Sequence, residues 1–418
     1  MPTGKHTGDQ ALVRELNLSI VLNVLREHSP LSRASLAAIT GLNRATVSSL
    51  INELTRAGLV WEVGIEATDD VGRPGRLLEL DPHAGRIIGM EVGVDFIALA
   101  IADFSSQIIW KRWVELTDGK SPEEVLGLAA DLIQEGVELT DKEYGQVLGL
   151  GVGVPGLVDV PRGHLLFAPN LGWRDVPVRS MFEERFPFTV YVENEANMAA
   201  LGESYFGVAR GYNCVLYISA GVGVGGGIVL GGQIMRGAMG FSGEVGHMTM
   251  VEDGPICGCG NRGCWETLAS ESALVRRMLE ALRRAGETPS WARDDHLTVP
   301  TVLEAARAGD RLARGVLNEV ARDVGLGIAN LVNVLNPEIV VLGGMLSMGG
   351  DLMLPTIRET LEHRGLRWLV QPLRLELAAL GRESCVLGGI ATVYDRVLSQ
   401  PVEAIPKVAQ GRRRTSIP

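Results

Sequence analysis

The chain has 418 residues, of which 46% are hydrophobic and 21% are charged, and its formal net charge is −11. This length is enough for two or three domains with sizeable cores. No apolar run is long enough to cross a membrane and the first thirty residues carry no signal-peptide pattern, so we expect a cytoplasmic globular protein. The negative charge argues against a protein that coats nucleic acid over its whole surface, although a local DNA-binding module needs only one basic face.

The first predicted elements are three helices. Apolar residues recur with helical periodicity over residues 11–30, in "ALVRELNLSIVLNVLREHSP", and the pattern stops at a proline. Ser32 can cap a short second helix, and Gly41 supplies the turn that follows it. Asn43 can cap a third helix over residues 44–57. Two short helices joined through a glycine-bearing turn predict a helix-turn-helix.

Residues 60–80 alternate apolar and polar side chains around a loop, which predicts a β-hairpin wing. A recognition helix presents short polar and cationic side chains near its N-terminus to the major groove, and a wing can place arginines against phosphates. The residues expected to contact DNA are Arg33, Asn43, Arg44, Thr46, Ser48, Ser49, Arg73 and Arg76. A helical protein-interaction domain is the alternative, because acidic residues such as Asp69 and Asp70 lie beside the wing.

From residue 86 onward the sequence predicts an α/β architecture, after a short linker near residues 80–85. Buried strands are predicted in residues 86–110, 147–159, 213–232 and 336–346, and helix-period segments lie between them. Several of these strands run into glycine-rich turns, which can cradle a phosphate on backbone N–H groups or can simply be tight turns. The last residues, "KVAQGRRRTSIP", are basic and predict a disordered tail.

The stretch "ICGCGNRGCWE", from residue 256 to residue 266, places three cysteines within eight residues. The chain has five cysteines in all, an odd and low number. In a reducing compartment the clustered three are better explained as metal ligands than as disulfide partners. Three reduced thiols without a metal are the alternative.

The order of motifs in the chain is similar to that of the ROK family of sugar kinases and sugar-responsive repressors. The motifs are "GMEVGVD", "GVGVPG", "APNLGW", "VENEANMAALGE", "SGEVGH", "CGCGNRGCWE" and "LNPEIVVLGG". The resemblance covers residues 86 to about 398, and the winged helix extends it to nearly the whole chain. Within the family the sequence resembles most the regulators of the xylose-repressor and glucose-repressor type.

The resemblance implies an α/β fold in which an N-terminal winged helix-turn-helix precedes a two-lobed actin-like (ribonuclease H-like) ATPase-type fold. We expect the DNA-binding domain in residues 1–82 and a first lobe in residues 83–193, completed by residues 385–400. A second lobe with the zinc loop and a dimerisation surface is expected in residues 194–384, and a disordered basic tail in residues 401–418.

The resemblance adds His247 to the three clustered cysteines as a fourth metal ligand. His247, Cys257, Cys259 and Cys264 supply one imidazole and three thiolates, a set suited to one tetrahedral structural Zn²⁺ ion. The resemblance also places sugar-binding side chains in the cleft between the lobes. These side chains are Asn170, Asn194, Glu195, Glu244, His247 and Glu266. His247 can ligate zinc through one ring nitrogen and contact a sugar hydroxyl through the other.

The kinase signature of the family is altered. Glu195 stands where the family motif usually has the general base Asp. The phosphate-binding pattern Asp-x-Gly-Gly-Thr is replaced here by Glu-Val-Gly-Val-Asp, in which Val94 adds bulk and Asp95 adds negative charge. We therefore expect no enzyme activity and no catalytic residues.

The sequence thus predicts a repressor of carbohydrate-utilisation genes that a sugar, with xylose or glucose as leading candidates, releases from its operator. Its expected partners are a palindromic double-stranded DNA operator, the sugar and further copies of itself, as a homodimer or homotetramer, with no membrane. A sugar kinase that kept a DNA-binding head is the main alternative. A scaffold released from DNA by a protein partner is a third.

Overall fold

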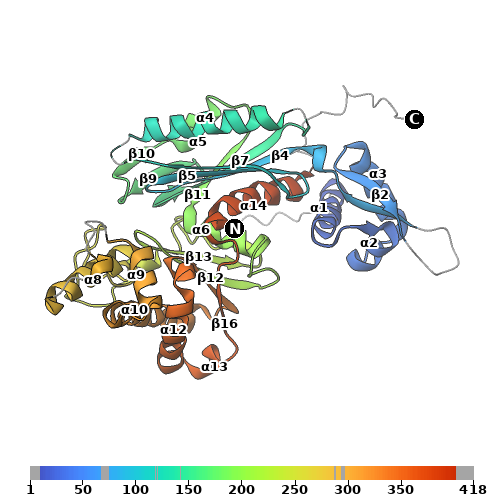
Figure 1. Cartoon of the computed structure of the whole chain (residues 1–418). Helices are drawn as coiled ribbons and strands as arrows, with labels where there is room; N and C mark the ends of the chain where they lie inside the picture. Colours follow the sequence, from blue (N-terminus) through green and yellow to red (C-terminus); the bar gives the residue numbers. More distant parts are fainter. Residues whose placement is uncertain are drawn as a thin grey trace.

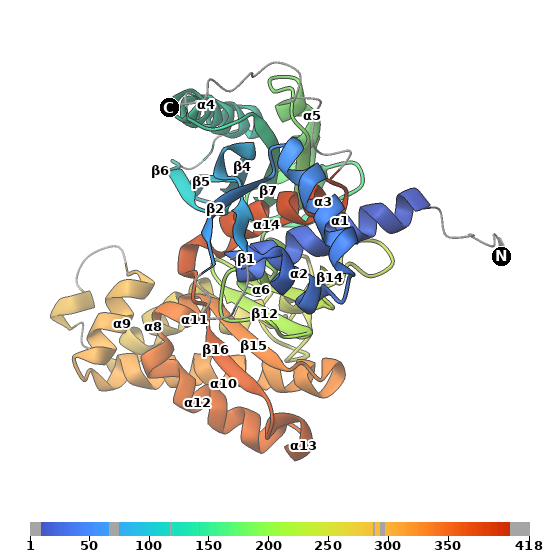
Figure 2. The same cartoon turned by 90° about the vertical axis from the view of Figure 1, so that its right-hand side faces the viewer.

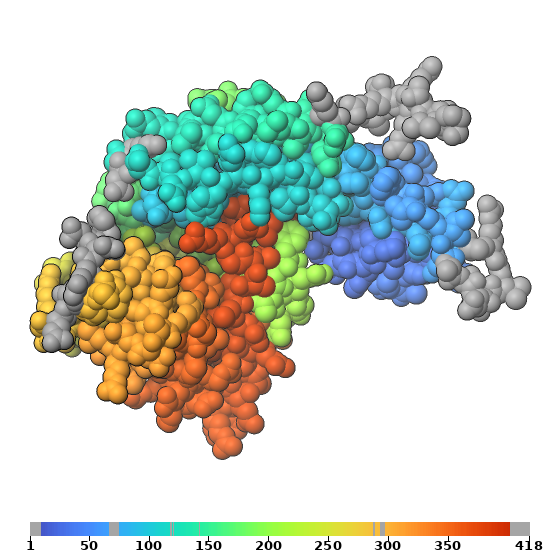
Figure 3. Space-filling model, in the orientation of Figure 1, coloured from blue at the N-terminus to red at the C-terminus, as the bar shows by residue number. Residues whose placement is uncertain are grey.

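The computed structural model describes residues 10–66, 75–117, 119, 121–141, 143–286, 289–292 and 297–401. Two α/β lobes lie one beside the other, and a small helical head adjoins one end of the first lobe (Figure 1). The space-filling view shows the head, in blue, against the cyan first lobe and away from the orange part of the second lobe (Figure 3). Within the described ranges, no helix is both long and apolar enough to cross a membrane.

The head, residues 10–80, is a winged helix-turn-helix, as predicted. Its elements are α1 (Gln10–His28), β1 (Leu31–Ser32), α2 (Arg33–Thr40), α3 (Arg44–Arg56), β2 (Val60–Ile65) and β3 (Arg76–Leu80). The strands form an antiparallel sheet in the order β1-β3-β2. Both predicted caps are present, because the Ser32 side chain accepts from the N–H of Ser35 and the Asn43 side chain from that of Thr46. Gly41 takes the left-handed conformation, with φ of 71°.

The segment predicted as a linker, residues 80–85, is structured and holds the head against the first lobe. The 3₁₀-helix η1 (Pro82–Ala84) follows β3 directly, and the N–H of Asp81 donates to the carbonyl of Leu59 inside the head. The N–H of Phe104, in the first lobe, donates to the carbonyl of Pro82. The apolar core of the head continues into the first lobe and α14 (Ser384–Ser399), where Phe104 and Tyr394 stack on each other. The head is therefore fixed to the lobe by buried surface.

The two lobes repeat one sheet topology. The first sheet comprises β4 (Arg86–Val92), β5 (Phe96–Asp103), β6 (Ile108–Glu115), β7 (Val147–Val154) and β11 (Val190–Asn194). The second comprises β12 (Cys214–Ala220), β13 (Val224–Leu230), β14 (Gln233–Ile234), β15 (Ile339–Gly344) and β16 (Arg374–Leu377). The strand order is β6-β5-β4-β7-β11 in the first sheet and β14-β13-β12-β15-β16 in the second. In each sheet the first three strands form an antiparallel meander, and the last two strands add in parallel beside the first strand. This is the mixed α/β fold that the sequence predicts.

Helices and a small side sheet complete the lobes. The first lobe carries α4 (Pro122–Thr140), α5 (Val178–Glu183) and the three-stranded sheet β8 (Leu157–Asp159), β9 (His164–Ala168) and β10 (Trp173–Val176). The second carries η2 (Val245–His247), α7 (Glu266–Ala269), α8 (Glu271–Ala285), η3 (Ser290–Ala292), α9 (Val299–Arg307), α10 (Arg311–Leu335), α11 (Met345–Met348), α12 (Gly350–Arg364), α13 (Arg367–Val370) and η4 (Gly381–Glu383). Each lobe has its own large apolar core.

Two helices connect the lobes, and each packs on the sheet of the other lobe. The chain leaves the first sheet through α6 (Glu195–Tyr205), which packs on β12 and β13 of the second sheet. It leaves the second sheet through α14 (Ser384–Ser399), which returns to pack on β4 and β7 of the first. The two helices also pack on each other, and both lie between the lobes in Figure 1. A Cβ at Gly202 would clash with the carbonyl oxygen of Ser384, and one at Gly388 with that of Met198. Glycine is needed here because the two backbones touch.

This contact generates a stability prediction. Replacing Gly388 by Ala inserts a methyl group against the backbone of α6, so the variant should lose about 1–3 kcal/mol in free energy of unfolding. Gly315→Ala is the matched control, because a Cβ there meets nothing within 4 Å on an exposed turn of α10. It should be neutral or stabilise by up to about 1 kcal/mol. Thermal unfolding of both variants checks this, and equal melting temperatures would contradict the tight crossing.

Candidate functional site

A cleft of about 750 Å³ lies between the lobes. Its walls come from both sheets, because the turn after β4, the start of α6, the turn between β12 and β13 and the start of α14 all reach it. All six residues predicted to bind sugar line it: Asn170, Asn194, Glu195, Glu244, His247 and Glu266. The structure thus brings these side chains to one place, and their binding of a sugar stays a prediction.

Asn194 fixes the start of α6. Its Oδ1 accepts from the N–H groups of Ala196 (2.8 Å) and Asn197 (3.2 Å), which makes it the N-cap of the helix. Its Nδ2 donates to the carbonyl of Gly156 (3.1 Å) and to Glu195 Oε2 (3.0 Å). Asn194 therefore orients the Glu195 carboxyl group at the first turn of α6.

An ion pair between the buried Glu193 and the partly exposed Arg236 also holds this segment. Glu193 is 3% exposed, and its Oε2 accepts from Arg236 Nε at 2.9 Å. Its Oε1 accepts from the backbone N–H of Asn194 (3.1 Å) and from Asn197 Nδ2 (3.2 Å). Because Arg236 follows β14 in the second lobe while Glu193 belongs to β11 in the first, this pair joins the lobes beside the cleft. Sequence reasoning misses it, since a lone arginine in a loop carries no motif.

Burial raises the pKa of several carboxyl groups in the cleft. The pKa of Glu195 is raised to about 8, mainly by burial and also by the neighbouring Glu91 and Glu244 carboxyl groups, while a backbone hydrogen bond acts in the opposite direction. Burial also raises the pKa of Glu91 to about 7, against a hydrogen bond with Cys385. At pH 7 the Glu195 side chain is mostly neutral, so it can donate a hydrogen bond as well as accept one.

Asn170 and Glu266 both lie beside Gly223, in the turn between β12 and β13. A Cβ built at Gly223, in that turn, would lie 2.7 Å from Glu266 Oε2 and 3.6 Å from Asn170 Nδ2. The glycine therefore leaves both polar groups open to the cleft. Asn170 comes from the loop between β9 and β10 of the first lobe, whereas Glu266 begins α7 of the second. A ligand that contacted both would bridge the lobes.

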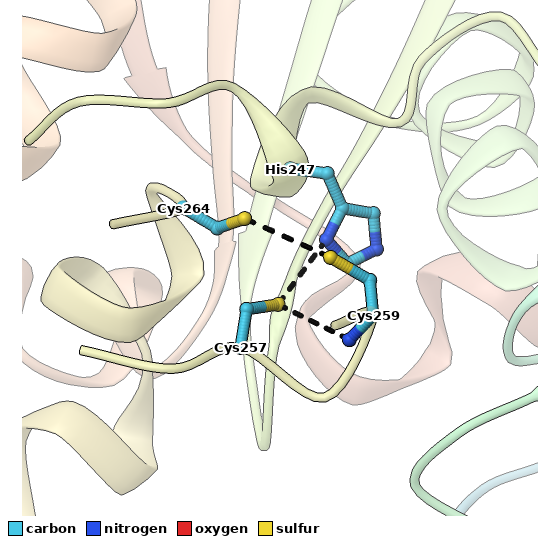
Figure 4. Close-up of side chains that lie close together, drawn as sticks. All are labelled: His247, Cys257, Cys259 and Cys264. Carbon is cyan, nitrogen blue, oxygen red and sulfur yellow. Dashed lines mark hydrogen bonds between the residues drawn. The ribbon is translucent and has the colours of Figure 1, made fainter. Parts of the chain in front are cut away.

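The predicted metal ligands converge on one point. One ligand atom from each of His247, Cys257, Cys259 and Cys264 lies within 4.8 Å of the others, so the four side chains can hold a metal ion (Figure 4). Cys259 Sγ and Cys264 Sγ are 3.8 Å apart, and Cys257 Sγ lies 3.6 Å from His247 Nδ1. All five cysteines of the chain are free thiols, so the disulfide alternative is not realised.

His247 connects this cluster to the cleft. Its Nδ1 faces the cysteines, whereas its Nε2 points toward Glu244, at 3.9 Å from Oε2. Glu266 reaches the cluster too, because the Cys257 thiol donates to Glu266 Oε1 at 2.7 Å. The same histidine and the same carboxylate therefore border both the metal cluster and the cleft.

Other cleft residues escape the sequence prediction. They include Phe96, Trp113, Glu271 and Arg382. The Phe96 and Trp113 rings stack with centroids 4.1 Å apart, and the Arg382 guanidinium lies over Trp113 at 5.6 Å. Phe96 and Trp113 come from the consecutive strands β5 and β6, whereas Arg382 comes from η4, far away in the sequence, so only the fold reveals that the three residues meet. Glu91 and Asp95, by contrast, lie within the quoted glycine motif.

The predicted DNA-reading residues occupy one side of the head. The N-terminal half of α3 exposes Arg44 and Ser49 and leaves Thr46 and Ser48 half-buried, while its opposite face is buried in the core. Asn43 is exposed, although its side-chain oxygen is used as the helix cap. Arg33 Nη2 donates to Asn52 Oδ1 at 2.9 Å, which joins α2 to α3. Asn52 and Arg56 continue the exposed stripe of α3 beyond the residues predicted.

The wing is described only in part. Arg76 is exposed and forms an ion pair with Glu62 across the hairpin, so its charge is partly compensated before any DNA is bound. Arg73 lies outside the described residues, as do Asp69 and Asp70. Contact of the wing with phosphates stays a prediction.

Comparison with known proteins agrees with this arrangement. The "ROK family" model matches residues 87–396 and a "Winged helix-turn-helix DNA-binding" model matches residues 15–60. A xylose repressor of Caldicellulosiruptor bescii is 37% identical over 396 residues, which cover 94% of this chain and 99% of that protein.

Two crystal structures are also similar. One is a ROK family transcriptional regulator, a homologue of the Escherichia coli MLC protein, with a TM-score of 0.82 and 24% identity over 94% of this chain and 99% of the other. The second is a ROK family glucokinase from Streptomyces griseus in complex with glucose and AMPPNP, with a TM-score of 0.65 and 34% identity over 74% of this chain and 100% of that one. The chain belongs to the ROK family and is a DNA-binding transcriptional regulator that resembles xylose repressors.

Proposed function

We propose that this regulator represses carbohydrate-utilisation genes and is released from its operator by a sugar bound in the cleft between the lobes. One observation carries the proposal: a DNA-reading head and a cleft lined with amides and carboxyl groups occur in one fold. The apolar core of the head includes residues of α14, the helix that begins at the cleft. Several relatives that match nearly the full length carry the name xylose repressor, whereas the glucokinases cover about three quarters of the chain.

The donor and acceptor groups of the cleft suit a sugar. Each sugar hydroxyl can both donate and accept, and Asn170, Asn194 and the carboxyl groups of Glu195, Glu244 and Glu266 offer both kinds of partner. The Streptomyces griseus glucokinase holds glucose in its crystal structure, which supports a hexose or pentose as the ligand of this chain. Xylose and glucose are the two sugars that the relatives' names suggest.

Zinc fits the metal cluster. A tetrahedral ion with Zn–S bonds of about 2.3 Å and a Zn–N bond of about 2.0–2.1 Å separates two sulfurs by about 3.8 Å and a sulfur from a nitrogen by about 3.6 Å. The corresponding distances of 3.8 Å and 3.6 Å in the cluster match these values. Four protein ligands leave no position for a reacting water, so the ion would be structural and would hold the wall that carries His247 and Glu266.

Kinase activity is the main alternative function, because this chain shares its fold and its cleft with glucokinases. Two features oppose it. Val94 and Asp95 line the cleft where the family's kinases carry a glycine and a threonine for phosphate, and Asp95 would repel phosphate. Glu195 stands where the family's kinases usually carry the general base Asp, and its additional methylene group displaces the carboxylate relative to the sugar hydroxyl. A scaffold displaced from DNA by a protein partner remains the third hypothesis.

A catalytic test separates repressor from kinase. Purified protein should show no ATP hydrolysis that depends on D-xylose or D-glucose at pH 7. A coupled assay, with a sugar kinase run beside it as positive control, provides the measurement. Turnover on the order of 1 per second or faster, which is ordinary for a working enzyme, would overturn the repressor-only proposal.

DNA binding should depend on the exposed face of α3. Each chain presents a single recognition helix, so we expect a homodimer on a roughly palindromic operator. Arg44→Ala should weaken specific binding by about 1–3 kcal/mol, if this side chain reaches a base or phosphate. Arg364→Ala, on the exposed surface of α12, is the charge-matched control and should bind normally. Equal losses in both variants, measured by fluorescence anisotropy, would count against α3 as the reading helix.

Zinc and sugar sensing should be linked. Cys259→Ser removes a thiolate that a hydroxyl cannot replace, so the variant should hold much less than one zinc per chain and lose its sugar response. Glu244→Ala keeps all four ligands, so it should retain zinc and operator binding while losing the sugar response. Metal analysis and operator titrations with and without D-xylose or D-glucose test both variants. A normal sugar response in a zinc-free Cys259 variant would separate the two functions.

A further inference from the structure

Three side chains from three helices meet where the head joins the lobes. The guanidinium carbon of Arg26, in α1, lies 4.5 Å from the ring centroid of Tyr205, the last residue of α6. The Tyr205 hydroxyl in turn donates to Asp395 Oδ1 of α14 at 3.2 Å. Figures 1 and 2 both show α1 lying against α14 at this place. We call these three residues the junction.

The two lobe helices of the junction both begin in the cleft. The first residue of α6 is Glu195, and α14 starts with Ser384 and Cys385, which also line the cleft. With 11 residues at about 1.5 Å of rise each, α6 spans about 16 Å from the cleft to Tyr205. A single rigid element therefore has one end among the predicted sugar ligands and the other on the DNA-binding head.

The packing between α6 and α14 lets neither helix shift alone. Their backbones touch at Gly202 and Gly388, with no side chain between them that could adapt. The buried Glu203 of α6 also accepts from the Ser384 hydroxyl (2.9 Å) and from the N–H of Leu380 (3.0 Å), just before α14. A displacement at the cleft end of α6 would thus carry Tyr205 and Asp395 together.

On the head side, Arg26 has few other partners. Among the described residues, its Nε is buried and has no hydrogen-bond partner, while Nη2 donates to the adjacent Glu27 at 2.5 Å. Burial keeps the pKa of Tyr205 above its usual value, so the hydroxyl stays protonated and continues to donate to Asp395. Two contacts therefore hold the Arg26 guanidinium, the ion pair with Glu27 on its own helix and the Tyr205 ring of the lobes.

We propose that the Arg26–Tyr205–Asp395 junction couples sugar binding in the cleft to the orientation of the DNA-binding head. The inference rests on the proposed function, because it assigns the contact through which a bound sugar changes operator affinity. The head also shares an apolar core with α14, in which Leu22 and Leu25 of α1 belong to the same cluster as Val397 and Leu398. That core keeps the head attached, so the junction sets its orientation and is not needed to hold it.

The test uses the full chain and a DNA fragment that the wild-type protein selects from a random pool. Operator affinity is measured without sugar and with D-xylose or D-glucose, and sugar binding is measured separately by calorimetry. In the wild type we expect the sugar to weaken operator binding by a factor in the usual allosteric range of about 5–150. In Tyr205→Leu that factor should fall below about two, while each ligand alone binds within about threefold of wild type.

Three further variants sharpen the result. Arg26→Gln should uncouple as Tyr205→Leu does, and the double variant should add nothing, because both changes remove one contact. Tyr205→Phe keeps the ring over Arg26 but loses the bond to Asp395, so its coupling should be intermediate. Tyr212→Leu removes a half-buried tyrosine that packs in the second lobe and should respond as wild type does.

The outcomes separate the two proposals. If a sugar releases the wild type and the Tyr205→Leu variant equally, the junction is refuted and the proposed function stands. If Arg26→Gln and Tyr205→Leu reduce the response additively, the two residues act independently and the junction as a unit is also refuted. If both sugars bind the wild type without weakening its hold on DNA, the proposed function fails and the junction fails with it.

Discussion

The architecture depends on the contact between α6 and α14. Each of these helices follows a strand of one sheet or its lobe and packs on the sheet of the other lobe, so the exchange of helices joins the lobes. The contact is possible only because glycine occupies the crossing points, where a Cβ would strike the opposing backbone. One part of the cleft wall follows from this crossing, since Asn194, Glu195, Ser384 and Cys385 all lie at the cleft ends of these two helices.

Kinases and regulators share this framework, and we propose that a few side chains of the cleft separate this chain from the kinases. The cleft of this chain keeps amides and carboxyl groups that can bind hydroxyls, while its phosphate turn carries Val94 and Asp95. Burial raises the pKa of Glu195 to about 8, so its carboxyl group can donate a hydrogen bond at pH 7 as well as accept one. Relatives named as repressors or regulators match nearly the whole chain, head included, whereas the glucokinases match about three quarters of it.

Features set by local sequence could be predicted. The caps Ser32 and Asn43, the left-handed Gly41 and the convergence of the cysteines on His247 all depend on residues close together in the chain or on a spaced motif. Contacts between distant segments could not be predicted from one sequence. The exchange of α6 and α14, the Phe96–Trp113 stack beneath Arg382 and the Glu193–Arg236 pair each join elements whose side chains show no local pattern.

The sequence alone also favours a DNA-binding head that is separated from the α/β lobes, because a linker is predicted near residues 80–85. The structure shows instead a 3₁₀-helix and a continuous apolar core between the head and α14. In our proposal this fixed attachment lets a change in the cleft reach DNA, because a shared core transmits a reorientation that a flexible linker would average out.

One rigid chain of contacts, in our proposal, couples a sugar in the cleft to DNA at the head. Thermodynamic reciprocity gives the most direct test, because a sugar that weakens operator binding must itself be bound less tightly, by a factor of the same size, when operator is present. Calorimetric titration of D-xylose and D-glucose into the protein, alone and saturated with operator, measures this factor. We predict a sugar affinity at least about fivefold lower in the operator complex. Equal affinities in the two titrations would contradict the coupling.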